Sequence, residues 1–121
     1  MPAADGRETP TLSGMHLTRI GLGNILLEPG EGLDPADPDA YLEPLLAHIQ
    51  RRAACRLIYD LKNVPLIDEV YYRWLLAVHA LCGIANIEMV VVHMRPAAAF
   101  ALSRLIDEPP PFRCALEVAR G

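Results

Sequence analysis

The sequence lacks the short motifs by which many enzymes and cofactor-binding domains are recognised. The glycine-rich phosphate-binding patterns GxGxxG and GxxxxGK do not occur, and neither do HExxH, CxxC or GxSxG. No nucleophilic side chain has an evident partner base along the chain. We therefore expect no catalytic residue, no cofactor and no enzymatic activity.

Long hydrophobic runs and an excess of basic residues are absent too. The longest uncharged apolar stretch centres on Met89–Val92, far short of the ~20 residues that cross a bilayer. The first residues, MPAADGRETP, lack the basic-then-apolar pattern of a signal peptide. A net charge of −4 gives no basic patch for a phosphate backbone. We expect a cytoplasmic protein of bacterial type, with neither a membrane nor a nucleic acid as partner.

Cysteine is scarce and odd in number, with three residues spread widely along the chain. This argues against a secreted disulfide framework. His79 and Cys82 are three residues apart, but a structural zinc site needs about four ligands and no second pair is spaced to join them. We expect no metal site, and we expect Cys55, Cys82 and Cys114 to pack as small hydrophobic residues.

The size and hydrophobic content of the chain indicate one globular domain. It has 121 residues, of which 52% are hydrophobic. Residues 1–13 are polar and without periodicity, so we interpret them as a flexible tail. Residues 14–121 are expected to form the domain.

The hydrophobic pattern predicts alternating strands and helices. Two apolar runs separated by Gly21-Leu22-Gly23 indicate a hairpin. The helical pattern after Asp37 contains Pro44, so that helix either begins near Tyr41 or is kinked. The expected segments are strands at 15–20, 24–28, 56–61, 87–94 and 112–118, and helices that start at Pro38 with Asp37 as N-cap, span 69–82 with Gly83 as the stop, and span 95–106.

This order predicts an α/β fold. Continuous apolar strands divided by helices favour a mixed, mostly parallel sheet with right-handed crossovers. We expect a sheet of about five strands, opened by an antiparallel hairpin, with three to four helices.

Two adjacent carboxylates stand at the junction in NVPLIDEVYYR. Asp68 and Glu69 end an apolar segment and precede a helical pattern. With Asp60 they could form an acid/base set, which would require carboxyl groups a few ångströms apart. A helix start is the better interpretation, with Asp68 as N-cap and Glu69 in the first turn.

The stretch RLIYDLKNVPLIDEVYYRWLLAVHALCGIANIEMVVVHMRPAAAFAL resembles the core of a STAS domain, the fold of the anti-sigma factor antagonists. The resemblance rests on a strand that ends at Asp60, an apolar run before Asp68-Glu69, a second strand, and the step Arg95-Pro96 into another helix. It covers residues 14–121 and is nearest to the short, stressosome-type antagonists. It implies a STAS-like fold and a protein-binding module in signal transduction, which exchanges partners in a stress response.

In that family a serine or threonine follows the aspartate and is phosphorylated by a serine/threonine kinase. Here that phospho-acceptor position is Glu69, and no serine or threonine occurs from Arg19 through Leu102. The resemblance therefore implies a module that keeps its docking surface and lacks the phosphorylation switch.

The resemblance also implies a partner-binding face formed by the 28–39 loop and the start of the Glu69 helix. Tyr72 falls toward the outside of that helix and is either spare surface or a contact anchor, since aromatic residues and arginine are favoured at interface centres. The residues expected to bind a partner are Asp34, Asp68, Glu69, Val70, Tyr72 and Arg73.

Three classes of function stay open. The first is the binding module, with an anti-sigma-type serine/threonine kinase or another STAS protein as partner. The second is a structural scaffold that assembles with itself, as in a homodimer, or with other STAS domains. The third is a small enzyme or ligand sensor, which would need a pocket lined by convergent polar groups.

Overall fold

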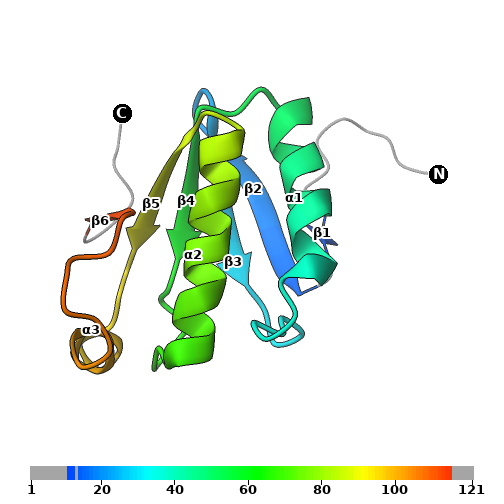
Figure 1. Cartoon of the computed structure of the whole chain (residues 1–121). Helices are drawn as coiled ribbons and strands as arrows, with labels where there is room; N and C mark the ends of the chain where they lie inside the picture. Colours follow the sequence, from blue (N-terminus) through cyan, green and yellow to red (C-terminus); the bar gives the residue numbers. More distant parts are fainter. Residues whose placement is uncertain (1–10, 13, 116–121) are drawn as a thin grey trace.

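The computed structural model describes residues 11, 12 and 14–115, and within them the chain forms one sheet covered by helices (Figure 1). The sheet has six strands in the order β1-β2-β3-β4-β5-β6. In chain order the elements are β1 (Thr11–Leu12), β2 (Met15–Ile20), β3 (Asn24–Pro29), α1 (Asp39–Arg51), β4 (Arg56–Asp60), α2 (Glu69–Ile84), β5 (Glu88–Val92), α3 (Pro96–Ser103) and β6 (Arg113–Ala115).

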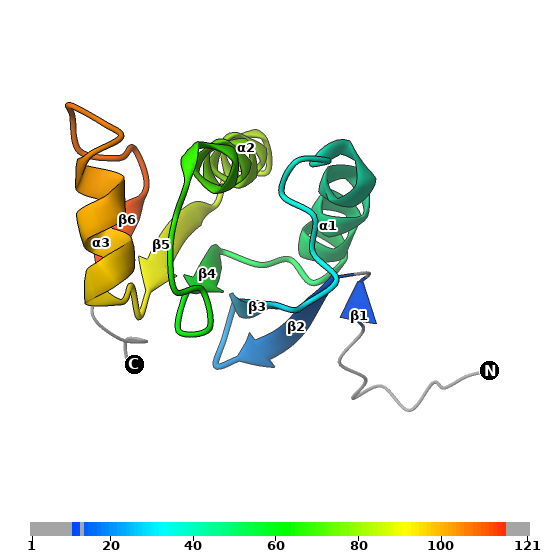
Figure 2. The same cartoon turned by 90° about the horizontal axis from the view of Figure 1, so that it is seen from below.

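The connections place the three helices on one face of the sheet. Strands β1 to β3 pair antiparallel, whereas β3 to β6 are parallel and are separated in sequence by α1, α2 and α3. Each parallel connection steps the same way along the sheet, so right-handed crossovers put every helix on the same side. Figure 2 shows α3, α2 and α1 in a row above the sheet. The predicted mixed sheet opened by a hairpin is confirmed.

Strand β1 is an addition to the predicted elements. Thr11 and Leu12 belong to the segment interpreted as a tail, but they pair with His16 and Met15 of β2. Residues 1–10 and 13, the rest of that segment, lie outside the described residues.

The core lies between the helices and the sheet. Alternate residues of each strand point toward the helices, as the burial of Leu57 and Tyr59 in β4 illustrates. Tyr41 of α1 meets Trp74 of α2 edge-to-face at 5.6 Å between ring centroids, and Trp74 is 0% exposed. Complete burial of one such large side chain contributes roughly 1.5–3 kcal/mol. A second, smaller cluster of Ile58, Val90 and Val92 lies apart from this core.

The turn between β2 and β3 confirms the predicted hairpin. Ile20 pairs with Asn24, which leaves the loop Gly21-Leu22-Gly23. The φ angles of Gly21 and Gly23 are +57° and +83°, a region that residues with a Cβ rarely adopt. A Cβ at Gly23 would also lie only 2.9 Å from Cys55 Sγ.

The start of α1 differs from the prediction by one residue. Pro38, not Asp37, occupies the N-cap, and no side chain caps the helix. Its first bonds come from the backbone, since Tyr41 N donates to the Pro38 carbonyl at 2.9 Å. Pro44 lies inside the continuous helix. Both Pro44 and Ala40 are exposed, so water can reach the carbonyl that the missing N–H would have engaged.

The end of α2 corrects the prediction that Gly83 stops the helix. The helix runs on to Ile84, and Asn86 takes the left-handed conformation with φ +62°. Ile87 N donates to the Cys82 carbonyl at 2.9 Å and Asn86 N donates to the Gly83 carbonyl at 3.1 Å. These are the two bonds of a Schellman ending, in which asparagine can replace glycine.

The end of α1 has the same geometry with a less suitable residue. Ala53 has φ +52°. Its N–H donates to the Gln50 carbonyl at 3.2 Å, and Ala54 N donates to the Ile49 carbonyl at 3.2 Å. The alanine Cβ makes this left-handed position unfavourable.

The C-terminal part of the described chain is less regular than predicted. Helix α3 ends at Ser103 and not at Ile106, although Ile106 N still donates to the Leu102 carbonyl. Strand β6 covers only three residues, and positions 116–118 of the predicted strand lie outside the described residues.

The predicted packing of the cysteines is correct for one of them. Cys82 is buried on the inner face of α2, whereas Cys55 and Cys114 are exposed. Cys55 directly precedes β4 and Cys114 lies on β6 at the border of the sheet, so neither is enclosed by the core. The apolar neighbours of these two residues in sequence therefore misled the prediction.

None of the helices in the described ranges combines the length and the apolar character that crossing a membrane requires.

The strained end of α1 yields a stability prediction. Ala53→Gly should stabilise the protein by about 1 kcal/mol, because glycine adopts φ +52° without the Cβ penalty. Urea unfolding followed by circular dichroism measures the change. Ala47→Gly, at an exposed position in the middle of α1, is the matched control and should destabilise by about 1 kcal/mol. A destabilised Ala53→Gly variant would contradict the assignment.

Candidate functional site

The candidate site lies where the parallel strands end. The carboxyl ends of β3, β4 and β5 point to the lower end of the molecule in Figure 1, where the β3–α1 loop and the start of α2 also lie. Binding sites in open parallel sheets usually form at this end. The segments expected to bind a partner are therefore close neighbours in the fold.

Asp68 is the N-cap of α2, as the sequence predicts. Its backbone is extended, with φ −98° and ψ −175°, and its Oδ1 accepts a hydrogen bond from Tyr71 N at 2.8 Å. This satisfies one of the N–H groups that a helix start leaves without an intrahelical acceptor. The side chain of Asp68 is thus committed to structure.

Glu69 is the first helical residue and is open to solvent. Its side chain is 69% exposed, and Oε2 meets Arg73 Nη2 at 2.6 Å one turn along. Arg73 is equally exposed, so the ion pair adds little stability and both groups stay accessible. The carboxylate lies at the positive end of the helix dipole, which favours a negative charge.

Apolar side chains border this pair. Val70 is 38% exposed and Leu66, in the loop before the helix, is 62% exposed. Tyr72 is less exposed than predicted, because its ring lies 6.3 Å from the buried ring of Phe112 and burial raises the pKa of its phenol. Of the aromatic and arginine side chains expected at the interface, Arg73 is the more exposed.

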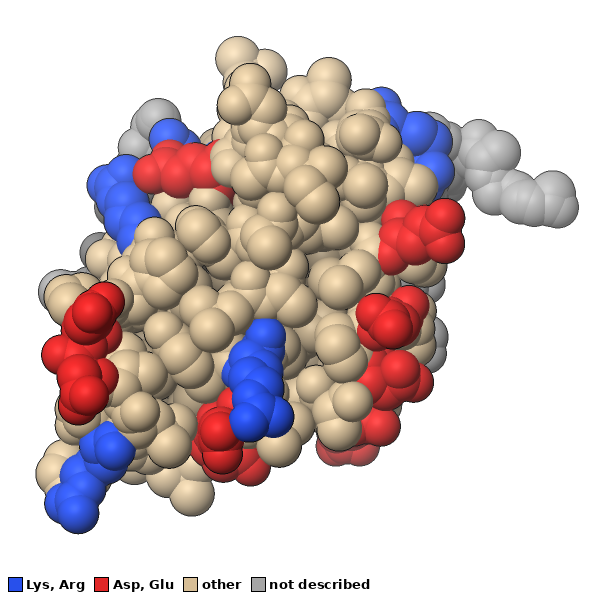
Figure 3. Space-filling view, in the orientation of Figure 1, with Lys and Arg blue, Asp and Glu red and all other residues tan. Residues whose placement is uncertain are grey.

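An acidic edge, defined here by the exposed carboxylates of the β3–α1 loop and α1, lies beside the site. Figure 3 shows acidic side chains gathered along the side formed by α1 and the loop before it. No lysine or arginine occurs between Arg19 and Arg51. The loop is ordered by Asp34, whose Oδ1 accepts from Ala36 N at 3.0 Å and whose N–H donates to the Tyr41 hydroxyl at 2.9 Å. The residues of the acidic edge are Glu31, Asp34, Asp37, Asp39 and Glu43.

A cleft joins the β3–α1 loop to the start of α2. It has a volume of about 450 Å³, and Tyr71 of α2 is one of its lining residues. Its other lining residues come from the end of β3 and from the loops after β3 and β4: Pro29, Gly30, Glu31, Leu33, Asn63, Val64 and Pro65. Sequence reasoning missed this cleft, because it depends on how two loops 30 residues apart approach each other.

Asp60, one of the three carboxylates considered as an acid/base set, is the buried member of a cluster of polar contacts. It is 3% exposed, and its Oδ1 lies 2.9 Å from His93 Nδ1 and also accepts from Lys62 N. Lys62 Nζ lies 3.7 Å from Asp60 and 3.5 Å from Glu28. The His93 ring, which directly follows β5, is thereby hydrogen-bonded to Asp60. Its partner was not predictable from spacing, since 33 residues separate the two.

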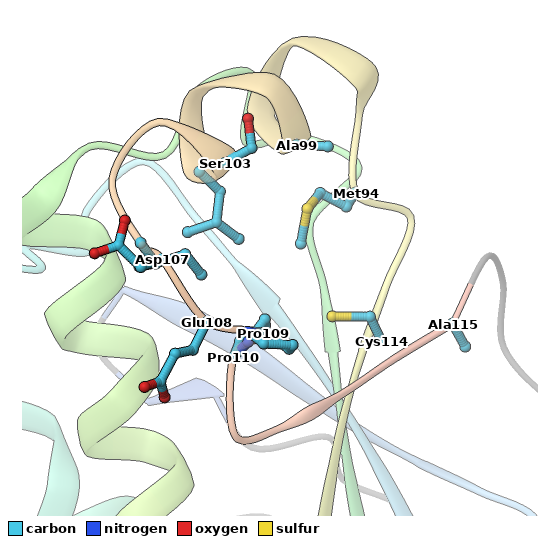
Figure 4. Close-up of a pocket in the computed structure, with 11 residues that line it drawn as sticks. Met94, Ala99, Ser103, Asp107, Glu108, Pro109, Pro110, Cys114 and Ala115 are labelled. Atoms are coloured by element: carbon cyan, nitrogen blue, oxygen red, sulfur yellow. The ribbon is translucent and has the colours of Figure 1, made fainter.

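An apolar groove lies on the other side of α2, between α3 and β6. Its volume is about 670 Å³. Figure 4 shows the sulfur atoms of Met94 and Cys114 directed into the groove, and the carboxylates of Asp107 and Glu108 directed away from it. Nothing in the sequence pattern indicated this groove.

Neither cysteine chemistry nor metal binding is supported around His79 and Cys82. Burial raises the pKa of the Cys82 thiol to about 12, so the thiol keeps its proton at neutral pH. The His79 ring faces Phe112 at 6.3 Å. Among the described residues no group of three or more His, Cys, Asp or Glu side chains is arranged to hold a metal ion.

The cap of α2 gives a second stability prediction. Asp68→Ala should destabilise the protein by about 1 kcal/mol, because Tyr71 N would lose its side-chain acceptor. Urea unfolding measures the loss. Asp68→Asn retains an accepting oxygen and should stay within a few tenths of a kcal/mol of the wild type; an equal loss in both variants would show that the negative charge, and not the cap, matters.

Comparisons with known proteins bear on the fold alone. No protein-family model matches the chain, and no curated protein matches its sequence. A serine-to-glutamate variant of RsbS from Moorella thermoacetica superposes with a TM-score of 0.72 and 20% identity over 84% of this chain and 88% of that chain. A structure of the stressosome, described as a signal integration and transduction hub, gives the same values. The protein TM1081 follows with a TM-score of 0.61 and 10% identity over 87% of this chain and 82% of that chain. The chain thus has the same fold as these structures, the STAS-like α/β fold that its sequence predicts.

Proposed function

We propose that this protein is a non-enzymatic binding module of the anti-sigma factor antagonist type, with Glu69 in place of a phosphorylated residue. It docks an anti-sigma-type serine/threonine kinase or another STAS protein through the start of α2 and the β3–α1 loop. The observation that carries the proposal is the exposure of Glu69, 69%, at the tip of a capped helix in a fold shared with RsbS.

The local geometry supports a fixed negative charge at this position. In the STAS family the acceptor lies at a helix start, where N–H groups and the helix dipole favour an anion. A phosphate carries about −1.5 to −2 charges, whereas the Glu69 carboxylate carries one.

The surroundings of Glu69 supply the other properties of a docking surface. Leu66 and Val70 offer exposed apolar contacts, and Arg73 offers a cation beside Glu69. The acidic edge adjoins them and favours a partner with basic side chains, because complementary charge speeds association and selects partners.

Phosphorylation assays test the missing switch. After incubation with an anti-sigma-type kinase and ATP, the wild type should gain no phosphate within residues 19–102, because that stretch has no hydroxyl acceptor of the serine/threonine kind. Glu69→Ser should gain one phosphate, detected by mass spectrometry of peptides. Glu69→Ala is the control, with neither hydroxyl nor carboxylate.

The same variants test partner choice. In pull-downs with the kinase and with a second STAS protein, the wild type and phosphorylated Glu69→Ser should retain the same partner, and unmodified Glu69→Ser should retain it less well. A stoichiometric phosphate on the wild-type core, or identical retention by all variants, would contradict the proposal.

A structural scaffold is the second candidate function. The apolar groove at the β6 border, together with Phe100 at 65% and Leu105 at 43% exposure, offers surface for contact between copies. The stressosome neighbour supports assembly with other STAS domains. Sedimentation velocity of the protein alone distinguishes the two: a homodimer or larger species supports a scaffold that assembles with itself, and a monomer disfavours it.

A further inference from the structure

A chain of three aromatic side chains runs from the core to the cleft. Trp74 Nε1 donates to the Tyr59 hydroxyl at 2.7 Å, and the hydroxyls of Tyr59 and Tyr71 are 2.7 Å apart. Trp74 and Tyr59 are both 0% exposed. Tyr71 is half-buried and lines the cleft.

Because Trp74 and Tyr59 are buried, the donor and the acceptor of each hydrogen bond between these three side chains can be assigned. An indole N–H only donates, so the Tyr59 oxygen accepts from Trp74. The proton of Tyr59 then needs an acceptor, and within the described residues the Tyr71 oxygen is the one at hydrogen-bond distance. The opposite direction would leave a donor unpaired inside the core, which proteins avoid. Tyr59 therefore donates to Tyr71.

The hydroxyl proton of Tyr71 is consequently free for a further acceptor. Among the described residues, the Tyr71 oxygen makes one hydrogen bond, the one with Tyr59. Burial raises the pKa of Tyr71 to about 12, so the phenol remains a donor at neutral pH. Successive hydrogen bonds polarise one another, which strengthens the last donor of the chain.

The cleft beside Tyr71 selects the class of acceptor. Pro29, Leu33, Val64 and Pro65 provide apolar walls, and the acidic residue Glu31 belongs to the same lining. A negative charge next to Glu31 disfavours an anionic acceptor. A neutral carbonyl attached to an apolar group can accept the hydrogen bond from Tyr71 while the apolar group packs against the walls. The volume of the cleft, about 450 Å³, lies within the range of small-ligand sites.

We propose that this cleft binds an extended peptide segment, with a backbone carbonyl of the peptide accepting a hydrogen bond from Tyr71 and an apolar side chain against Val64 and Pro65. The identity of the segment rests on the proposed function, because the partner docked at Glu69 supplies it. Tyr71 follows Glu69 by two residues and its N–H holds the Asp68 cap, so one partner can reach both places.

Titration of the isotope-labelled full chain with N-acetyl-leucine N-methylamide tests the cleft without any protein partner. The probe has two amide carbonyls and one apolar side chain. We expect saturable NMR shifts of the Gly30, Asn63 and Val64 amides, and an affinity about fivefold lower in Tyr71→Phe, the loss of one hydrogen bond. Tyr72→Phe removes a hydroxyl from the adjacent residue, which does not line the cleft, and should bind as the wild type does.

Two further readouts complete the test. In the wild type, the ring carbon that bears the Tyr71 hydroxyl should shift with the probe and that of Tyr72 should not, so the test does not depend on the folding of Tyr71→Phe. Acetate, which offers the same oxygen with a negative charge, should bind more weakly than the amide.

The outcomes separate this inference from the proposed function. Absence of shifts in the cleft, equal affinity of Tyr71→Phe and the wild type, equal loss in both tyrosine variants, or tighter binding of acetate would each overturn the peptide site. A failure to retain a kinase or STAS protein counts against the proposed function only, since the probe titration contains neither.

Discussion

The position of every segment of the candidate site depends on one topological constraint, the uniform direction of the three parallel crossovers. Because β3, β4, β5 and β6 follow one another across the sheet, right-handed connections leave α1, α2 and α3 on the same face. The strand ends, the two loops that follow β3 and β4, and the N-terminus of α2 then meet at one end of the molecule (Figure 1). Residues far apart in sequence form one surface there without any dedicated binding domain.

At that end the two neighbouring carboxylates have different tasks. Asp68 folds back on the helix and accepts from Tyr71 N, so its charge is used within the fold. Glu69 projects outward and forms an exposed ion pair with Arg73, which is weak. The helix start is therefore capped by one carboxylate while the second stays open to solvent.

The sequence predicted those parts that depend on local residue preferences. Asp68 before a helical pattern predicted the cap, Gly21 and Gly23 predicted the hairpin, and the continuous apolar runs predicted parallel strands. Local preferences also caused the errors. Gly83 predicts the end of α2, but the left-handed residue at which the helix ends is Asn86. Asp60–His93 and the chain Trp74–Tyr59–Tyr71 join strands to other elements, so they require the three-dimensional register that no local pattern contains.

Tyr71 belongs to the cap and to the cleft at the same time. Its backbone nitrogen holds Asp68, its hydroxyl meets Tyr59, and its ring forms part of the cleft lining. If a ligand in the cleft displaces this ring, the backbone of the same residue carries the displacement to the turn before Glu69. Any free energy that couples the two places must act equally in both directions. A partner bound at the helix tip would then change the affinity of the cleft for its ligand by the same factor by which that ligand changes the affinity of the tip for the partner.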